Sequence, residues 1–148
     1  MDLIILNNMN KNIMKMDSTW NTAIILKKTL PKRGKLTIMK DIKSGELFLG
    51  RKVKYEVFDC LIHEGNDGGT SFTPNRVWKY IPPIDENPEK WNPITSQVKN
   101  KIMVFHVNDN SSFPYILGYI DENNNIRHGI NYYRKTPINE VDYFFEID

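Results

Sequence analysis

The class of fold is decided by residues 36–49, which read Leu-Thr-Ile-Met-Lys-Asp-Ile-Lys-Ser-Gly-Glu-Leu-Phe-Leu. Leu36 and Ile38 occupy alternate positions before a polar run, and Leu47 and Leu49 repeat this spacing after it. A period of two is typical of half-buried β-strands. Gly45, in the polar run, can adopt the positive φ that a tight turn requires. The stretch therefore predicts a β-hairpin.

The same alternation continues on both sides of this hairpin. Residues 20–26 place Trp20, Thr22, Ile24 and Leu26 on one face of an expected strand. Residues 53–63 alternate and then become almost continuously apolar, which predicts one central strand that is covered on both faces. Further strands are expected at 77–81, 102–107, 115–121, 126–133 and 141–147, the last with Val141, Tyr143, Phe145 and Ile147 on one face. The strands 115–121 and 126–133 are expected to pair as a second hairpin across the polar turn 122–125.

These segments predict a mainly β fold: a single compact antiparallel β-barrel or β-sandwich of about eight or nine short strands with little helix. Only residues 96–101 suggest a helical turn, and the sequence contains no evident internal repeat. The chain has 148 residues, a common size for one domain. We expect a single β-rich domain over residues 16–148 and a peripheral N-terminal extension over residues 1–15.

The composition indicates a folded protein, because 26% of the residues are charged and 40% are hydrophobic. The one cysteine, Cys60, excludes an internal disulfide and a CxxC site, and it fits a reducing compartment. The apolar run Leu3–Leu6 is too short for a secretory signal or a membrane span. We therefore expect a cytoplasmic protein that does not contact a membrane.

The charge of the chain is unevenly distributed. Residues 1–54 contain twelve Lys or Arg and four Asp or Glu, whereas residues 55–148 contain eight and fourteen. This asymmetry predicts a basic face that binds nucleic acid or another polyanion, formed by Lys32, Arg33, Lys35, Arg51, Lys52 and Lys54. Alternatively, these side chains protect strand edges from aggregation. The aromatic residues that either stack on bases or form the core are Trp20, Phe48, Tyr55 and Trp78.

Two irregular segments are candidate contact surfaces. Residues 64–71 form a glycine-rich loop whose backbone amides can bind an anion or a partner, with Asn66, Asp67, Gly68, Gly69 and Thr70 at its centre. A long hairpin connection explains the same residues. The segment Pro82–Pro93 contains four prolines and Trp91. It either presents Trp91 to a protein partner or packs this ring inside the fold.

The sequence contains no recognisable catalytic constellation. Its histidines, His63, His106 and His128, match no metal-binding spacing, and His106 is in phase with apolar neighbours, as a half-buried structural imidazole would be. Cys60 lies in an apolar run, where the reactive thiolate is disfavoured. We therefore predict no catalytic residue, no metal and no cofactor, although His63 with Glu64 and the glycine-rich loop leave a small hydrolase or ligand-binding protein as an alternative.

Three classes of function remain open from the sequence. The first is a non-catalytic binding domain that contacts nucleic acid or another polyanion through its basic face. The second is a protein–protein interaction or inhibitor module that uses Pro82–Pro93, and the third is the small hydrolase or ligand-binding protein. The abundance of Asn and Lys is also typical of viral or phage accessory proteins.

Overall fold

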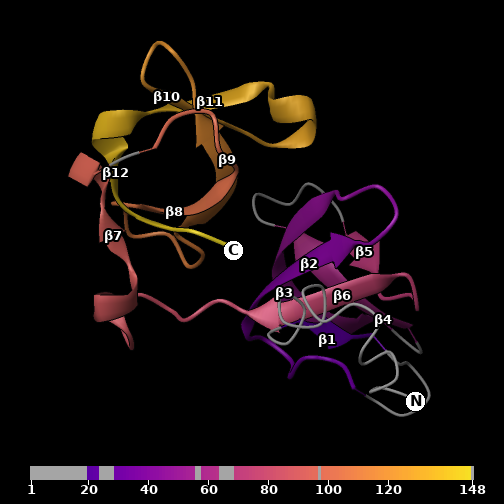
Figure 1. Ribbon diagram of the computed structural model, residues 1–148. Helices are drawn as coiled ribbons and strands as arrows, with labels where there is room; N and C mark the ends of the chain where they lie inside the picture. Colours follow the sequence, from indigo (N-terminus) through magenta and orange to yellow (C-terminus); the bar gives the residue numbers. More distant parts are fainter. Residues whose placement is uncertain (1–19, 24–28, 56–57, 64–68, 97, 148) are drawn as a thin grey trace, which may run out of the picture. The chain divides into compact units, whose positions relative to one another are not determined.

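The computed structural model describes residues 20–23, 29–55, 58–63, 69–96 and 98–147 (Figure 1). Within these ranges, twelve strands form two antiparallel sheets of six strands each, and no helix reaches seven residues. The prediction of a mainly β, antiparallel fold with little helix is confirmed. The strand count is higher than the predicted eight or nine because several strands are only two to four residues long, too short to produce a recognisable alternation.

The N-terminal sheet consists of a short first strand, a four-stranded meander and a returning strand. Its strands are β1 (Asn21–Thr22), β2 (Leu36–Asp41), β3 (Leu47–Tyr55), β4 (Phe58–His63), β5 (Gly69–Ser71) and β6 (Arg76–Tyr80). The spatial order is β1-β6-β2-β3-β4-β5. The last strand, β6, therefore lies between the short first strand and the first strand of the meander.

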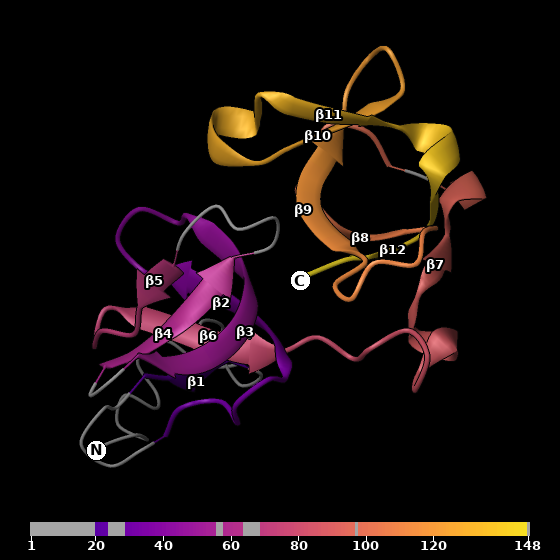
Figure 2. The ribbon, with the colours of Figure 1, turned by 180° about the vertical axis from the view of Figure 1, so that it is seen from behind.

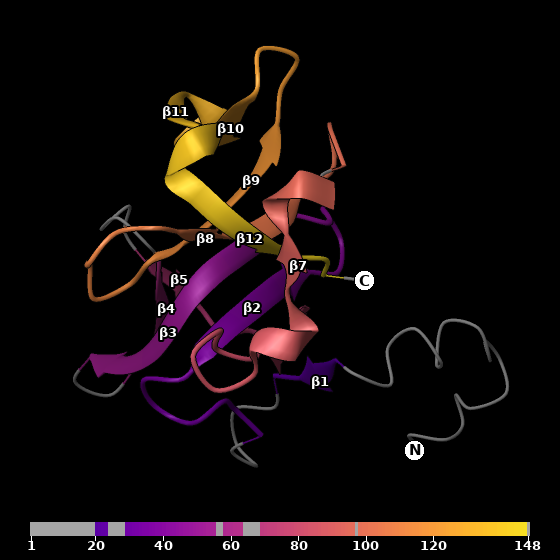
Figure 3. The same ribbon diagram turned by 90° about the vertical axis from the view of Figure 1, so that its left-hand side faces the viewer.

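The C-terminal sheet repeats this connectivity. Its strands are β7 (Asn92–Pro93), β8 (Met103–Val107), β9 (Tyr115–Ile120), β10 (Asn125–His128), β11 (Arg134–Pro137) and β12 (Val141–Phe145), in the order β11-β10-β9-β8-β12-β7. β8–β11 form the meander, and β12 returns between β8 and β7 (Figure 3). The sheet curves strongly (Figure 2). Each strand of the C-terminal sheet thus occupies the same position in its sheet as the strand six places earlier in the chain does in the N-terminal sheet. The sequence nevertheless shows no repeat. Neither sheet closes into a barrel.

Short 3₁₀ turns connect parts of the second half of the chain: Pro88–Lys90, Ile94–Ser96, Ile130–Tyr132 and Ile138–Glu140. The turn Ile94–Ser96 overlaps the helical turn that was expected over residues 96–101 only at Ser96. Residue 97 lies outside the described ranges, and residues 98–101 are not helical. Over the part of the chain that the structure describes, no helix has the length and apolar character needed to cross a membrane.

The chain divides into two compact units. An N-terminal unit contains the chain up to Leu61 together with Ser71–Tyr80, and a C-terminal unit contains Ile62–Thr70 and Ile81–Ile147. Each unit has its own buried apolar cluster. The assignment of residues 16–148 to one domain stays a prediction, and residues 1–15 lie outside the described ranges.

The predicted hairpin over residues 36–49 is confirmed. Lys40 pairs with Leu47 across β2 and β3, and Gly45 has a φ of +78°. Met39 in β2 is fully buried and packs in the core of the N-terminal unit. The indole N–H of Trp78, also in this core, donates a hydrogen bond to the backbone carbonyl of Thr29 (2.9 Å). Burial of the tryptophan ring is therefore compatible with its one polar group.

Three sequence-based predictions for the N-terminal sheet were wrong in detail. The expected strand at 20–26 is represented among the described residues by β1, in which Thr22 is exposed while Trp20 before it is buried, so these two do not share a face as expected; Ile24 and Leu26 lie outside the described ranges. The expected central strand at 53–63 is two strands, β3 and β4, which are adjacent in the sheet. The expected loop at 64–71 ends in a strand, because residues 69–71 form β5. Continuous apolar character does not reveal where a chain reverses direction.

The last strand, β12, also differs from its predicted alternation. Its pairing with β8 shifts register between Val141 and Tyr143, which marks a β-bulge. A bulge adds one residue to one strand and thereby changes which side chains face inward. Phe144 is consequently 2% exposed and belongs to the core of the C-terminal unit, whereas Tyr143 is 37% exposed.

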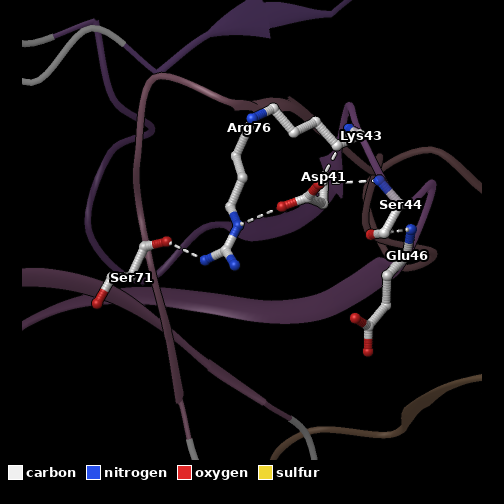
Figure 4. A network of polar contacts seen from close by, with 6 residues as sticks. All are labelled: Asp41, Lys43, Ser44, Glu46, Ser71 and Arg76. Carbon is white, nitrogen blue, oxygen red and sulfur yellow. Dashed lines mark hydrogen bonds and ion pairs between the residues drawn. The ribbon is translucent and has the colours of Figure 1, made fainter.

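A polar network holds the β2–β3 turn (Figure 4). Oδ1 of Asp41 accepts hydrogen bonds from the backbone N–H groups of Lys43 and Ser44, both at 3.0 Å. Its Oδ2 accepts a hydrogen bond from Nε of Arg76 (3.2 Å), and Arg76 also donates to the carbonyl of Ser71 (2.6 Å). The backbone N–H of Ser44 and the Arg76 guanidinium lower the pKa of Asp41, because both favour the charged carboxylate.

The lowered pKa of Asp41 makes the stability of this turn dependent on pH. A carboxyl whose pKa is lower in the folded chain stabilises it above the unfolded pKa of about 3.9, and this contribution disappears as the pH falls through the folded pKa. We expect Asp41→Asn to lower the urea midpoint at neutral pH and to have little effect near about pH 2. Glu46→Gln, the same charge change at an exposed carboxylate, is the control; an equal loss in both variants at neutral pH would contradict the prediction.

Candidate nucleic-acid interface

The turn that precedes β2 lies beside the middle of β3. The backbone N–H of Lys35 donates to the carbonyl of Lys32 (3.3 Å), and Gly34, with a φ of +79°, donates to the carbonyl of Lys52 (3.1 Å). The next residue along the chain, Leu36, pairs with Arg51. The structure thus brings together, at the level of the backbone, five of the six predicted anion-binding residues.

We call these five residues the basic cluster: Lys32, Arg33, Lys35, Arg51 and Lys52. The three residues of the turn are exposed, and the two residues of β3 are half-buried. Neighbouring residues of a strand point to opposite faces, so the side chains of Arg51 and Lys52 leave β3 on opposite sides. The basic cluster therefore surrounds one part of the β2–β3 ladder. Lys54, the sixth predicted residue, also lies in β3, but its side chain is outside the described part of the structure.

An exposed tyrosine lies next to the basic cluster. The hydroxyl oxygen of Tyr80 accepts a hydrogen bond from the backbone N–H of Lys32 (2.8 Å). Its ring is 43% exposed and contacts the ring of Trp78 edge-on, with centroids 5.1 Å apart. Trp78 and Tyr80 share a face of β6, but Tyr80 ends the strand and so extends beyond the core. The alternation in residues 77–81 was the signal for this face, but it did not show which ring would be exposed.

The aromatic residues that the sequence suggested for stacking are mostly core residues. Trp20 and Trp78 are buried, Phe48 packs against the core of the N-terminal unit, and the side chain of Tyr55 lies outside the described part. The ammonium groups of Lys40 and Lys79 lie 4.8 and 4.7 Å from the centroid of the Trp20 ring. These two lysines therefore make cation–π contacts with a buried ring.

The predicted contact residues of the glycine-rich loop and of the Pro82–Pro93 segment lie outside the described ranges, in a strand or in the core. Asn66, Asp67 and Gly68 lie outside the described ranges, whereas Gly69 and Thr70 belong to β5. Trp91 is 5% exposed.

The surroundings of Trp91 explain its burial. Its indole N–H donates to the carbonyl of Pro82 (2.8 Å), and its ring centroid lies 5.7 Å from that of Tyr115 and 5.4 Å from that of Phe145. Trp91 therefore packs inside the C-terminal unit, which is the alternative that the sequence left open. Its ring is not presented to a partner in this structure.

The described histidines have structural surroundings. His106 is half-buried, as expected, and its Nδ1 lies 2.7 Å from Oδ1 of Asp142 at the bulge of β12. His128 is buried, with Nε2 2.9 Å from the hydroxyl of Thr136. The side chain of His63 and all of Glu64 are outside the described part. Among the residues that are described, no three His, Cys, Asp or Glu side chains are grouped so that they could hold a metal ion.

Comparison with known proteins adds no functional information: no family model, no curated protein and no solved structure matches the chain.

Proposed function

We propose that this chain is a non-catalytic binding protein that contacts nucleic acid or another polyanion through the basic cluster. The observation that supports the proposal is the hydrogen bond from Gly34 to Lys52, which brings a turn with three exposed cations next to β3. Several cations within a short stretch of surface attract the phosphates of a nucleic acid and release its counterions. Tyr80, beside Lys32, adds an exposed ring.

In this proposal the antiparallel sheets act as a scaffold for the basic cluster, and the protein works in the cytoplasm. The protein-interaction alternative has less support because Trp91 is buried. The hydrolase alternative depends on His63 and Glu64, and neither side chain is described.

The proposal is tested with the triple variant Lys32→Gln, Arg33→Gln and Lys35→Gln. These side chains are exposed, so their replacement should leave the fold intact, whereas Arg51 and Lys52 are half-buried. We expect affinity for single-stranded DNA to fall by about tenfold or more at low salt, and the slope of log K against log salt to decrease by about 2, because each lost phosphate contact removes about 0.7. Fluorescence anisotropy over a salt series measures both quantities.

The matched control is a triple variant with the same charge change elsewhere, Lys43→Gln, Lys90→Gln and Lys99→Gln, whose side chains are also exposed. If binding depends only on net charge, the two triple variants will lose the same affinity for the DNA. Equal weakening, or unchanged binding in the cluster variant, would overturn the assignment of the basic cluster.

A further inference from the structure

One part of the C-terminal unit has the opposite charge from the rest. The unit contains eleven Asp or Glu and six Lys or Arg in total. Residues 126–137, from β10 to β11, contain three Arg or Lys and no Asp or Glu. The same twelve residues include Tyr132 and Tyr133. Basic and aromatic side chains are thus interleaved here.

The strand register arranges three of these side chains in a row. Tyr119 pairs with Arg127 across β9 and β10, and Arg127 pairs with Lys135 across β10 and β11. Ile120 and Ile126, the residues next to Tyr119 and Arg127 along their strands, are fully buried in the core. Since neighbouring residues of a strand point to opposite faces, the row lies on the outer face of the sheet.

The turn between β10 and β11 adds Tyr132 to this face and is followed by the exposed Tyr133. The ring centroid of Tyr132 lies 5.4 Å from that of Tyr119, and Nε of Arg127 donates to the carbonyl of Tyr132 (3.1 Å). Asn131 and Tyr132 have φ values of +55° and +54°, which non-glycine residues rarely adopt and which cost free energy. The next residue, Tyr133, is exposed.

Tyr133 is the most exposed of the large apolar or aromatic side chains that the structure describes. It is 64% exposed, and the guanidinium carbon of Arg134 lies 5.9 Å from its ring centroid. A tyrosine that is mostly exposed has room to stack on a base, and the nearby cation can also attract a phosphate. Every base has a π-face, so such stacking tolerates different sequences.

We propose that the surface formed by Tyr119, Arg127, Tyr132, Tyr133 and Lys135, which we call the tyrosine patch, is a second contact site that binds single-stranded nucleic acid. A base stacks on Tyr133, and Arg127 and Lys135 contact the adjoining phosphates. In a duplex the base faces are occupied by neighbouring bases, so this contact requires a single strand. The proposal rests on the proposed function and specifies the nucleic acid that the protein prefers.

One acidic neighbour of this surface is Asp121. Its Oδ1 already accepts hydrogen bonds from the backbone N–H groups of Asn123 and Asn125, both at 2.9 Å. The carboxylate is thus held by the β9–β10 turn. The cations Arg127 and Lys135 also act on it, so it reduces, without cancelling, the positive charge of the patch.

The test compares a probe that has bases with one that has none. The probes are a labelled oligothymidylate of about 16 nucleotides and inorganic polyphosphate. We expect Tyr133→Ala to weaken oligothymidylate binding about tenfold, the loss of one stacked base, and to leave polyphosphate binding unchanged. Tyr133→Phe keeps the ring and should bind like the unmodified chain. Tyr143→Ala removes another exposed tyrosine of the same unit and serves as the matched control.

Unchanged oligothymidylate affinity in Tyr133→Ala would overturn the tyrosine patch. A similar loss in Tyr143→Ala would also overturn it, since the effect would then not belong to Tyr133. The triple variant of Lys32, Arg33 and Lys35 separates the two proposals. Loss of these cations should weaken the binding of both oligothymidylate and polyphosphate. If that variant binds both probes normally while Tyr133→Ala binds oligothymidylate more weakly, the proposal for the basic cluster is wrong and the proposal for the tyrosine patch is retained. If the unmodified chain bound neither probe, both proposals would be overturned.

Discussion

Phe144→Ala is expected to destabilise the C-terminal unit by about 3–5 kcal/mol, the usual cost of removing a buried phenylalanine. Phe144 is 2% exposed, and its ring centroid lies 6.5 Å from that of Phe105 in the same core. The neighbouring change Tyr143→Ala is expected to cost much less, about 1 kcal/mol, because that side chain is 37% exposed and lies outside the core. Urea unfolding followed by circular dichroism measures both changes.

This comparison also tests the bulge in β12. Uninterrupted alternation from Val141 would place Tyr143 inside the core and Phe144 outside it. The register shift between Val141 and Tyr143 reverses this assignment. A larger loss of stability in Tyr143→Ala than in Phe144→Ala would show that the bulge is absent.

Gly118→Ala is expected to destabilise the C-terminal unit by about 3 kcal/mol or more, at the upper end of overpacking effects. A Cβ atom at this position would lie 2.0 Å from the backbone oxygen of Arg127 in the adjacent strand β10. Backbone in a paired strand cannot move away without breaking the ladder. The expected decrease in Tm is about 12 °C or more, since 1 kcal/mol corresponds to about 4–8 °C in a unit of this size.

Gly34→Ala is the control for Gly118→Ala. Nothing lies within 4 Å of a Cβ atom at Gly34, but its φ is +79°. Its cost should therefore be limited to the left-handed conformation, about 1–2 kcal/mol. If Gly118→Ala lowers the stability no more than Gly34→Ala does, β9 and β10 do not approach each other this closely at Gly118.

The features that the sequence predicted well are those that depend on neighbouring residues. The hairpin at 36–49 follows from alternate apolar residues on both sides of a turn with Gly45. The β9–β10 hairpin follows in the same way, and its turn uses Asn124 at a φ of +59°. The high content of cations near the N-terminus was also visible directly.

The sequence could not show which distant residues meet. The basic cluster depends on a hydrogen bond between Gly34 and Lys52, and the tyrosine patch depends on the pairing of Tyr119, Arg127 and Lys135 across three strands. A shift of one residue in either register would send these side chains to the opposite face.

By itself, therefore, the sequence determined the β class, the two clear hairpins and the asymmetry of charge, because turn chemistry and period-two alternation are local properties. Only the tertiary structure decided the repeated strand order, the burial of Trp91 and the exposure of Tyr80 and Tyr133. These features depend on strand register, on a bulge and on the side chains that cover each ring. All three are set by packing between segments that lie far apart in the chain.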